Sequence, residues 1–217
     1  MRLSSDTCFI CDASELEDPI LFSRAWDVVS SQRRDLADSF VFRKDKDLSL
    51  AAGIFMRLVE NEYGPIFKGP NGKPECKGLE FNISHSDRYT VFVSSEAPVG
   101  IDIEAISDNS QIYKTVMTPD EFGDFIEAVP LEERDKVFCR MWTAKESYMK
   151  ALGTGMTLPP ESFRVLFGDR ICSNTLDRGL EIQELEAPEG YCMSVCSDHK
   201  GFRAERIDIQ RCLHLLE

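Results

Sequence analysis

The chain has 217 residues, of which 42% are hydrophobic and 29% charged, as in an ordinary globular protein. This length suits one large domain or two small domains that share a core. The formal net charge of -13 at pH 7 argues against binding to nucleic acid, whose phosphates need a basic surface, and against an anionic membrane.

The sequence predicts a cytoplasmic protein. It contains no apolar run of transmembrane length, and its first residues, MRLSSD, lack the apolar core of a secretory signal. Eight cysteines in a chain of this length then suit a reducing compartment. Cys8 and Cys11 have the spacing of half a zinc site or a redox pair. No second close pair follows them, so buried thiols on a strand are the favoured interpretation.

The first hundred residues show helical patterns between strand patterns. Helical turns are predicted over 21–30 and 32–40. Apolar side chains then recur every three or four positions from Leu48 to Val59, which indicates one face of an amphipathic helix that ends near Gly64. The strands expected in this part are 7–11, 80–84, 89–94 and 99–104. Short polar turns join the last three, which predicts an antiparallel meander.

The pattern begins again with helices after these strands. Thr118 and Glu121 flank a proline in the arrangement of a capping box, which predicts the start of a helix. A long helix is predicted over 131–152, with Gly153 as its end. The segments that alternate like a second small meander are 163–167, 180–185, 191–196 and 202–207.

Helices followed by strands, twice, predict an α+β fold of two related halves, 1–105 and 106–217. The likeness between the halves is one of element order. We find no sequence repeat strong enough to establish a duplication from the residues alone.

Two short stretches carry residues that can hold a divalent cation beside a phosphate. Asp102 and Glu104 are two apart, so on a strand their side chains point to the same side. Glu146 and Lys150 are four apart on the long helix, in one stripe with Trp142. Taken alone, these are a polar strand face and a surface Glu–Lys pair. Taken together, three carboxylates without cysteine or histidine favour Mg²⁺ or Mn²⁺ over zinc.

Two further segments carry candidate phosphate contacts. Residues 81–86 (FNISHS) close a predicted strand with Ser84 and His85, just upstream of the carboxylate strand. Lys73 lies in the loop 69–74, which is rich in glycine and proline. A lone histidine is more often structural than catalytic, and a lone loop lysine is usually solvated. A functional role for His85 or Lys73 is therefore an interpretation that depends on the motifs around it.

Three motifs in order, 81–86 (FNISHS), 100–104 (GIDIE) and 142–150 (WTAKESYMK), resemble the signatures of the 4′-phosphopantetheinyl transferases. They look most like the long, Sfp-type branch, which serves nonribosomal peptide and polyketide synthases. The likeness extends over roughly half the chain. The resemblance implies a pseudo-twofold arrangement of two α+β halves, with coenzyme A bound in the cleft between them.

The resemblance also implies roles for individual residues. Mg²⁺ is expected on Asp102, Glu104 and Glu146 and on the pyrophosphate of coenzyme A. Lys150 is expected to contact the phosphate and to help deprotonate the acceptor. Glu121 stands where the family often has an acid near the metal, but the capping box explains it equally well. The expected contacts to coenzyme A are Lys150, Lys73, Ser84 and His85. Two more, Arg34 and Lys44, are chosen from the basic residues Arg33, Arg34, Lys44 and Lys46, whose register no motif fixes.

The implied reaction transfers the 4′-phosphopantetheine arm of coenzyme A to a serine of an apo acyl or peptidyl carrier protein and releases adenosine 3′,5′-bisphosphate. Alignment and charge neutralisation would drive it, and Lys150, Glu121 or a metal-bound water would take the serine proton. One alternative is a non-catalytic module of the same fold that binds coenzyme A or carrier proteins. Another is a different Mg²⁺-dependent phosphotransferase, although the sequence has no glycine-rich P-loop. We expect a monomer that serves fatty acid, polyketide or nonribosomal peptide synthesis.

Overall fold

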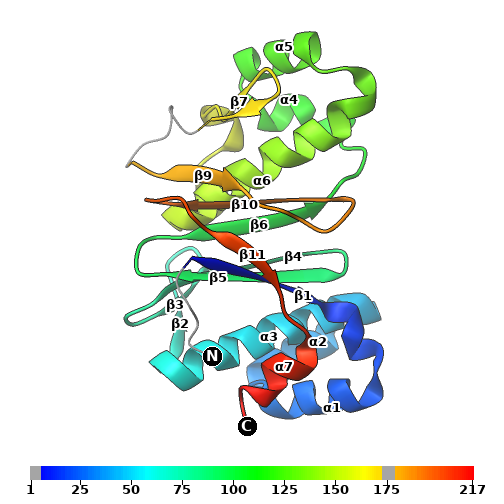
Figure 1. The fold of residues 1–217 in the computed structure, drawn as a ribbon, viewed down its shortest axis with the longest axis vertical. Coiled ribbons are helices and arrows are strands. Elements are labelled where there is room, and N and C mark those ends of the chain that lie inside the picture. Colours follow the sequence, from blue (N-terminus) through cyan, green and yellow to red (C-terminus); the bar gives the residue numbers. More distant parts are fainter. Residues whose placement is uncertain (1–5, 173–178) are drawn as a thin grey trace. The chain divides into compact units, whose positions relative to one another are not determined.

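The computed structural model describes residues 6–172 and 179–217. Both parts of the chain mix helices with strands (Figure 1), so the predicted α+β class is confirmed. Within these two ranges, no helix is long and apolar enough to cross a membrane. The described chain divides into two compact units, called here the first and the second unit, which contain 6–96 with 203–217 and 97–172 with 179–202.

The bounds of these units differ from those of the predicted halves, 1–105 and 106–217. Strand β6 (Gly100–Ala105), which the sequence pattern puts at the end of the first half, packs in the second unit. The C-terminal residues 203–217 return to the first unit. The two halves were predicted from a repeated order of helices and strands, whereas the two units are defined by packing. The division into two related halves therefore stays a prediction.

The helices of the first unit start and end within a few residues of their predicted bounds. The Asp18 carboxylate accepts a hydrogen bond from the Ile20 backbone N–H at 2.7 Å, and the Ser30 hydroxyl caps the next helix. The amphipathic helix ends at Gly64, which has a φ of +96°, a value that favours glycine. These predicted helices are α1 (Pro19–Val28), α2 (Ser31–Ser39) and α3 (Arg43–Tyr63). Two helices of the unit were not predicted, η1 (Ala13–Glu17) and α7 (Ile209–His214).

Four strands form the main sheet of the first unit in the order β11-β1-β5-β4. β4 and β5 are an antiparallel hairpin, as predicted, with Ser86 opposite Tyr89. β11 runs parallel to β1, so its predicted place in a second meander is wrong. A smaller hairpin flanks the predicted loop at 69–74. The strands of this unit are β1 (Thr7–Asp12), β2 (Ile66–Lys68), β3 (Pro74–Cys76), β4 (Glu80–Ser86), β5 (Tyr89–Ser95) and β11 (Arg203–Arg206).

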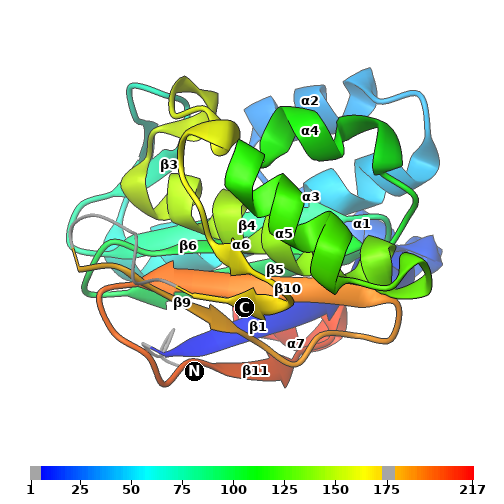
Figure 2. The same cartoon turned by 90° about the horizontal axis from the view of Figure 1, so that it is seen from above.

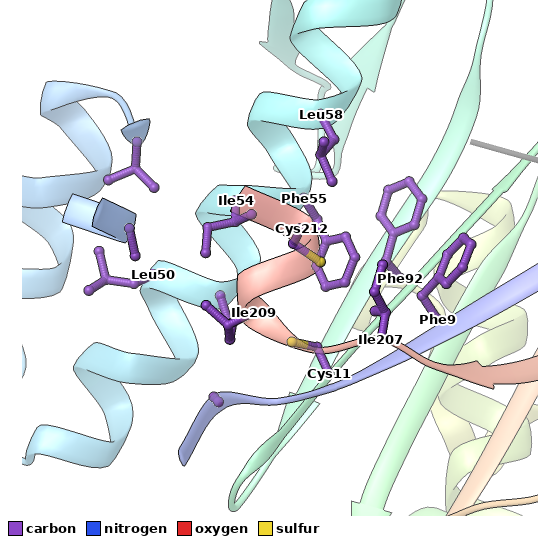
Figure 3. Packing of buried hydrophobic residues seen from close by; sticks show 14 of the residues in the cluster. Phe9, Cys11, Leu50, Ile54, Phe55, Leu58, Phe92, Ile207, Ile209 and Cys212 are labelled. Carbon is purple, nitrogen blue, oxygen red and sulfur yellow. The ribbon is translucent and has the colours of Figure 1, made fainter. Parts of the chain in front are cut away.

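The core of the first unit lies between α3 and this sheet (Figure 3). Phe55 of α3 stacks on Phe92 of β5 with ring centroids 5.1 Å apart, and Phe81 of β4 lies 6.1 Å from Phe92. Full burial of each ring contributes about 1.5–3 kcal/mol. Cys8 and Cys11 are buried free thiols on β1, as predicted.

The second unit contains the antiparallel sheet β6-β10-β9. β6 pairs with β10, so that Asp102 lies opposite Ser194, and the predicted meander of β6 with β4 and β5 is therefore wrong. The local pattern predicts β6 correctly as a strand, but its partner is about ninety positions away in the sequence. The other strands of this unit are β7 (Leu166–Phe167), β8 (Arg170–Ile171), β9 (Glu181–Glu184) and β10 (Tyr191–Ser197).

One long helix lies against a face of this sheet, as Figures 1 and 2 show. This helix, α6 (Arg134–Leu152), ends where predicted, because Gly153 adopts a left-handed φ of +66°. The remaining helical elements of the unit are η2 (Ser110–Ile112), α4 (Tyr113–Val116), α5 (Pro119–Ala128), η3 (Leu131–Glu133), η4 (Gly155–Thr157) and η5 (Pro160–Ser162).

Candidate active site

Helix α6 runs antiparallel along strand β6, and its contacts with the sheet follow one another in order. The Cys139 thiol donates to the backbone oxygen of Glu104 at 3.4 Å. One helical turn later, the Thr143 hydroxyl lies 3.1 Å from that of Ser194, which is opposite Asp102. Four helical residues rise about 6 Å and two strand residues about 6.6 Å, so the two spacings match. The match brings the carboxylate motif of β6 beside the motif of α6.

Gly100 allows β6 to approach α6 this closely. A Cβ atom at this position would lie 2.1 Å from the backbone oxygen of Ser147 and 2.3 Å from the backbone nitrogen of Ala151. Both are main-chain atoms of the helix, which cannot rotate away as a side chain can. Only glycine leaves the space that this contact requires.

Asp102, Glu146 and Lys150 form an interacting group within the second unit. The Lys150 ammonium donates to Asp102 Oδ1 at 2.5 Å. The Asp102 side chain is 2% exposed, whereas that of Lys150 is 26% exposed and can still reach solvent. Burial raises the pKa of Glu146, and the Asp102 carboxylate raises it further, while the Lys150 ammonium opposes both. The structure thus brings Asp102 of the predicted strand together with Glu146 and Lys150 of the predicted helix.

Glu104 completes the predicted set of metal ligands. It lines a small cavity of about 130 Å³ together with Cys139 and Trp142. Within 6–172 and 179–217, no three histidine, cysteine, aspartate or glutamate side chains are gathered closely enough to enclose a metal ion. Mg²⁺ does not need such a cage, because it is commonly held by one or two carboxylates, waters and substrate phosphates. The all-oxygen donor set therefore fits Mg²⁺ or Mn²⁺.

Glu121 lies in the interior, where its contacts are structural. Its Oε2 atom accepts from the Lys145 ammonium at 2.5 Å, and both side chains are fully buried. Its Oε1 atom accepts from the backbone N–H groups of Val165 and Leu166 at 3.0 and 2.8 Å. The predicted capping box with Thr118 is confirmed. These bonds tie α5, α6 and β7 together, and they give Glu121 a structural role in place of the acid–base role that the resemblance left open.

Apart from Lys150, the predicted contacts to coenzyme A belong to the first unit. Ser84 and His85 are neighbours on β4, so their side chains point to opposite faces, and Ser84 is buried whereas His85 is exposed. The Lys73 ammonium lies 3.7 Å from Glu80 Oε2. Burial lowers the pKa of Lys73, and the nearby Glu80 carboxylate opposes that change.

The two basic residues chosen from the N-terminal part differ in their surroundings. The Arg34 guanidinium donates to the backbone oxygens of Trp26 and Val29 at 3.1 and 3.3 Å. These bonds tie α2 to the end of α1. Lys44 has an exposed side chain and lies 3.5 Å from Asp87. Of the two, Lys44 presents its charge at the surface.

Arg33, which is not in the predicted set, lines a larger cavity of the first unit. This cavity of about 430 Å³ is also lined by Arg57 and Lys68, with Glu60 as an acidic neighbour. Burial lowers the pKa of Arg33. The sequence holds one signal for this site: Gly53 interrupts an otherwise regular helix, and a Cβ there would meet the Arg33 side chain at 2.7 Å.

Comparison with known proteins decides the family. A model of the 4′-phosphopantetheinyl transferase superfamily matches residues 98–196. A 4′-phosphopantetheinyl transferase of Bacillus subtilis is 33% identical over 189 residues, which cover 80% of this chain and 84% of the relative. The chain belongs to the 4′-phosphopantetheinyl transferase superfamily. The transferase Sfp of Bacillus subtilis strain 168 is 30% identical over the same shares of both chains. The transferase gsp of Aneurinibacillus migulanus is 33% identical over 184 residues, 78% of this chain and 76% of the relative.

These relatives confirm the predicted family, its Sfp-type branch and the enzyme class. The part matched by the superfamily model contains β6 and α6, and therefore all three predicted metal ligands and Lys150. Apart from Lys150, the predicted contacts to coenzyme A precede residue 98 and lie outside that part. The strand–helix pair is thus the portion of this phosphopantetheinyl transferase to which the family model directly applies.

Two residues absent from the predicted set position this site of the phosphopantetheinyl transferase. Gly100 sets the distance between β6 and α6. Lys145 precedes Glu146 and anchors α6 through four bonds, to the Glu121 carboxylate and to three backbone oxygens. A glycine inside a strand is a known signal of close backbone approach, but the partner of a buried lysine is a tertiary contact that local sequence does not reveal.

Proposed function

We propose that this chain transfers the 4′-phosphopantetheine arm of coenzyme A to a serine hydroxyl of an apo acyl or peptidyl carrier protein in the cytoplasm, as a monomer. Asp102, Glu104 and Glu146 hold Mg²⁺ in this proposal, and adenosine 3′,5′-bisphosphate leaves. Family membership supports the transferase activity on carrier proteins. The contact between Asp102 and Lys150, with Glu146 one helical turn away, is the observation that carries the metal and phosphate roles.

The reaction forms a bond between the serine oxygen and the phosphorus of phosphopantetheine. The bond from that phosphorus to the bridging pyrophosphate oxygen breaks, and this oxygen leaves with the adenosine bisphosphate. Mg²⁺, when bound, neutralises the charge on the pyrophosphate and on the leaving group. The carrier protein brings the nucleophile, so the chain itself needs no activated serine. Its own contribution is to align the two substrates.

Lys150 has two tasks in this proposal. Its position in the last turn of α6 holds the ammonium beside Asp102, where a phosphate bound over the carboxylates would also lie. The ammonium stabilises the charge that develops on the phosphate oxygens. A base takes the serine proton: Lys150 in its neutral amine form, or a water that Mg²⁺ held by Asp102, Glu104 and Glu146 would supply. The buried contacts of Glu121 favour these two candidates over Glu121 as the base.

Coenzyme A is proposed to bind to Lys73, Ser84 and His85, with its 3′-phosphate on basic residues of the N-terminal part. Arg34 is engaged with backbone oxygens, whereas Lys44 is exposed. The cavity beside Arg33 offers a further group of cations for an anionic ligand. The pseudo-twofold arrangement, with coenzyme A between two similar halves, remains part of the proposal. A long helix against an antiparallel hairpin in each unit is consistent with it.

The test incubates the full chain with coenzyme A, Mg²⁺ and an apo carrier protein, and follows the mass of the carrier protein. We expect the mass of one phosphopantetheine group to be added. Glu146→Gln should lose this transfer, whereas Glu127→Gln, the same change at an exposed position of α5, should keep it. A failure of the unaltered chain with several carrier proteins, while coenzyme A still binds, would instead favour a non-catalytic binding module. Transfer by Glu146→Gln at the normal rate would remove Glu146 from the metal site.

A further inference from the structure

Two cysteine thiols lie close together at the level of the candidate metal ligand Glu104. Cys139 lies on α6 and Cys192 on β10, and the Cys192 thiol donates to the backbone oxygen of Lys136 on α6 at 3.8 Å. Cys192 lies directly opposite Glu104 in the pairing of β10 with β6. The Cys139 thiol also donates to the Glu104 backbone oxygen at 3.4 Å. A helix and a strand are therefore joined by two thiols at the edge of the site.

A small molecule can reach Cys139 through a cavity. Cys139 and Cys192 are only 3% and 7% exposed, so bulk solvent meets little of either residue. Cys139 lines the cavity of about 130 Å³ that it shares with Glu104 and Trp142. A water molecule takes up about 30 Å³ of liquid volume, and hydrogen peroxide is little larger, so the cavity can admit a peroxide.

A second thiol pair provides an internal comparison. Cys11 on β1 and Cys212 on α7 belong to one buried cluster of the first unit. Figure 3 shows both thiols inside the core, and the two residues are 0% and 1% exposed. In both pairs a cysteine on a helix packs beside a cysteine on a strand. They differ because Cys139 lines a cavity, whereas Cys11 and Cys212 lie among core side chains.

We propose that Cys139 and Cys192 are a redox modification site, at which a peroxide oxidises the two thiols to a disulfide and so slows phosphopantetheine transfer. One sulfur attacks a peroxide oxygen and breaks the O–O bond, which gives a sulfenic acid and the first water. The second sulfur then displaces the sulfenic hydroxyl, which leaves as the second water. The peroxide gains two electrons, and the two sulfurs lose them. A thiol reductant reverses the bond.

The disulfide changes the surroundings of Glu104 in two ways. It removes the thiol hydrogen that Cys139 donates to the Glu104 backbone oxygen. It also draws α6 and β10 together at this level, because a covalent bond of about 2.05 Å is shorter than any contact between two unbonded sulfurs. The expected effect on transfer depends on the proposed metal role of Glu104, but formation of the disulfide does not. The chemical step and its consequence can therefore be measured separately.

The experiment treats the full chain with hydrogen peroxide and measures both the cross-link and the ratio of transfer rates after and before treatment. Peptide mass analysis without reductant should show Cys139 joined to Cys192. The rate should fall about 10-fold or more, the size typical of a disturbed outer-shell partner of a metal ligand, and dithiothreitol should restore it. Cys11→Ala should behave like the unaltered chain. Cys139→Ala, and separately Cys192→Ala, should form no such cross-link and keep a ratio near one.

Three results would overturn the proposal. The first is oxidation of other cysteines while Cys139 and Cys192 stay unlinked. The second is a cross-link with an unchanged transfer rate. The third is an equal loss of rate in Cys139→Ala, which would assign the peroxide effect to another site. The rate of the untreated chain separately reports whether the proposed transfer occurs.

Discussion

Replacement of Gly100 by alanine tests the contact between β6 and α6. The new methyl group would lie 2.1 Å from the Ser147 oxygen and 2.3 Å from the Ala151 nitrogen, whereas ordinary contacts of a Cβ begin near 3.4 Å. Strand and helix must therefore separate by roughly 1 Å. Overpacking of this kind costs about 1–3 kcal/mol of folding free energy. A displacement of about 1 Å at an active site can also cost about 100-fold in rate.

The assay combines urea unfolding with the rate of phosphopantetheine transfer. We expect Gly100→Ala to unfold at a lower urea concentration and to transfer about 100 times more slowly. Gly123→Ala is the matched control, because an added Cβ there meets nothing within 4 Å. Gly123 lies inside α5, so alanine should raise the free energy of unfolding by about 1 kcal/mol and leave the rate unchanged. Normal stability and a normal rate in Gly100→Ala would refute the reasoning about this contact.

Three further changes test other parts of the structure. Lys145→Met leaves Glu121 buried without its cation, so the free energy of unfolding in urea should fall by about 3–5 kcal/mol. A loss below about 1 kcal/mol would contradict the structural role of the pair. Arg33→Ala should weaken the binding of coenzyme A in calorimetry but not that of 3′-dephospho-coenzyme A, whereas equal weakening of both would remove the 3′-phosphate from the cavity. Although burial raises the pKa of Asp12, hydrogen bonds from Arg88 and its neighbours lower it on balance. The stability that Asp12 contributes is therefore complete above its unfolded pKa of about 3.9, and it is lost as the pH falls through the lower pKa of the folded state. The free energy of unfolding should thus fall with decreasing pH in this range, and it should fall less steeply in Asp12→Asn.

Local sequence patterns predicted those parts of the fold that depend on neighbouring residues. The periodicity from Leu48 to Val59 predicts α3, and the capping box at Thr118 predicts the start of α5, because both arise within one helix. The pairing of strands depends on residues far apart in sequence. β6 pairs with β10, and β11 pairs with β1 across almost the whole chain, so short connections between strands were a poor guide to the sheets.

The candidate site follows the same division. Asp102, Glu146 and Lys150 could be predicted because each motif has a regular spacing on one element, and the structure brings these three together. Glu121 has two explanations in the sequence, and only its tertiary contact with Lys145 separates them. The structural role of Glu121 is thus harder to predict than the grouping of Asp102, Glu146 and Lys150, because it depends on a partner elsewhere in the chain.

Binding of Mn²⁺ tests the proposed carboxylate metal site most directly. The signal of free Mn²⁺ in electron paramagnetic resonance can be followed as the chain is titrated in the presence of coenzyme A. We expect the unaltered chain and Glu127→Gln to remove Mn²⁺ from solution stoichiometrically. Asp102→Asn and Glu146→Gln should bind it at least about 10-fold more weakly, because each loses a charged oxygen ligand. Equal Mn²⁺ affinity in all four proteins would contradict a metal site built from β6 and α6.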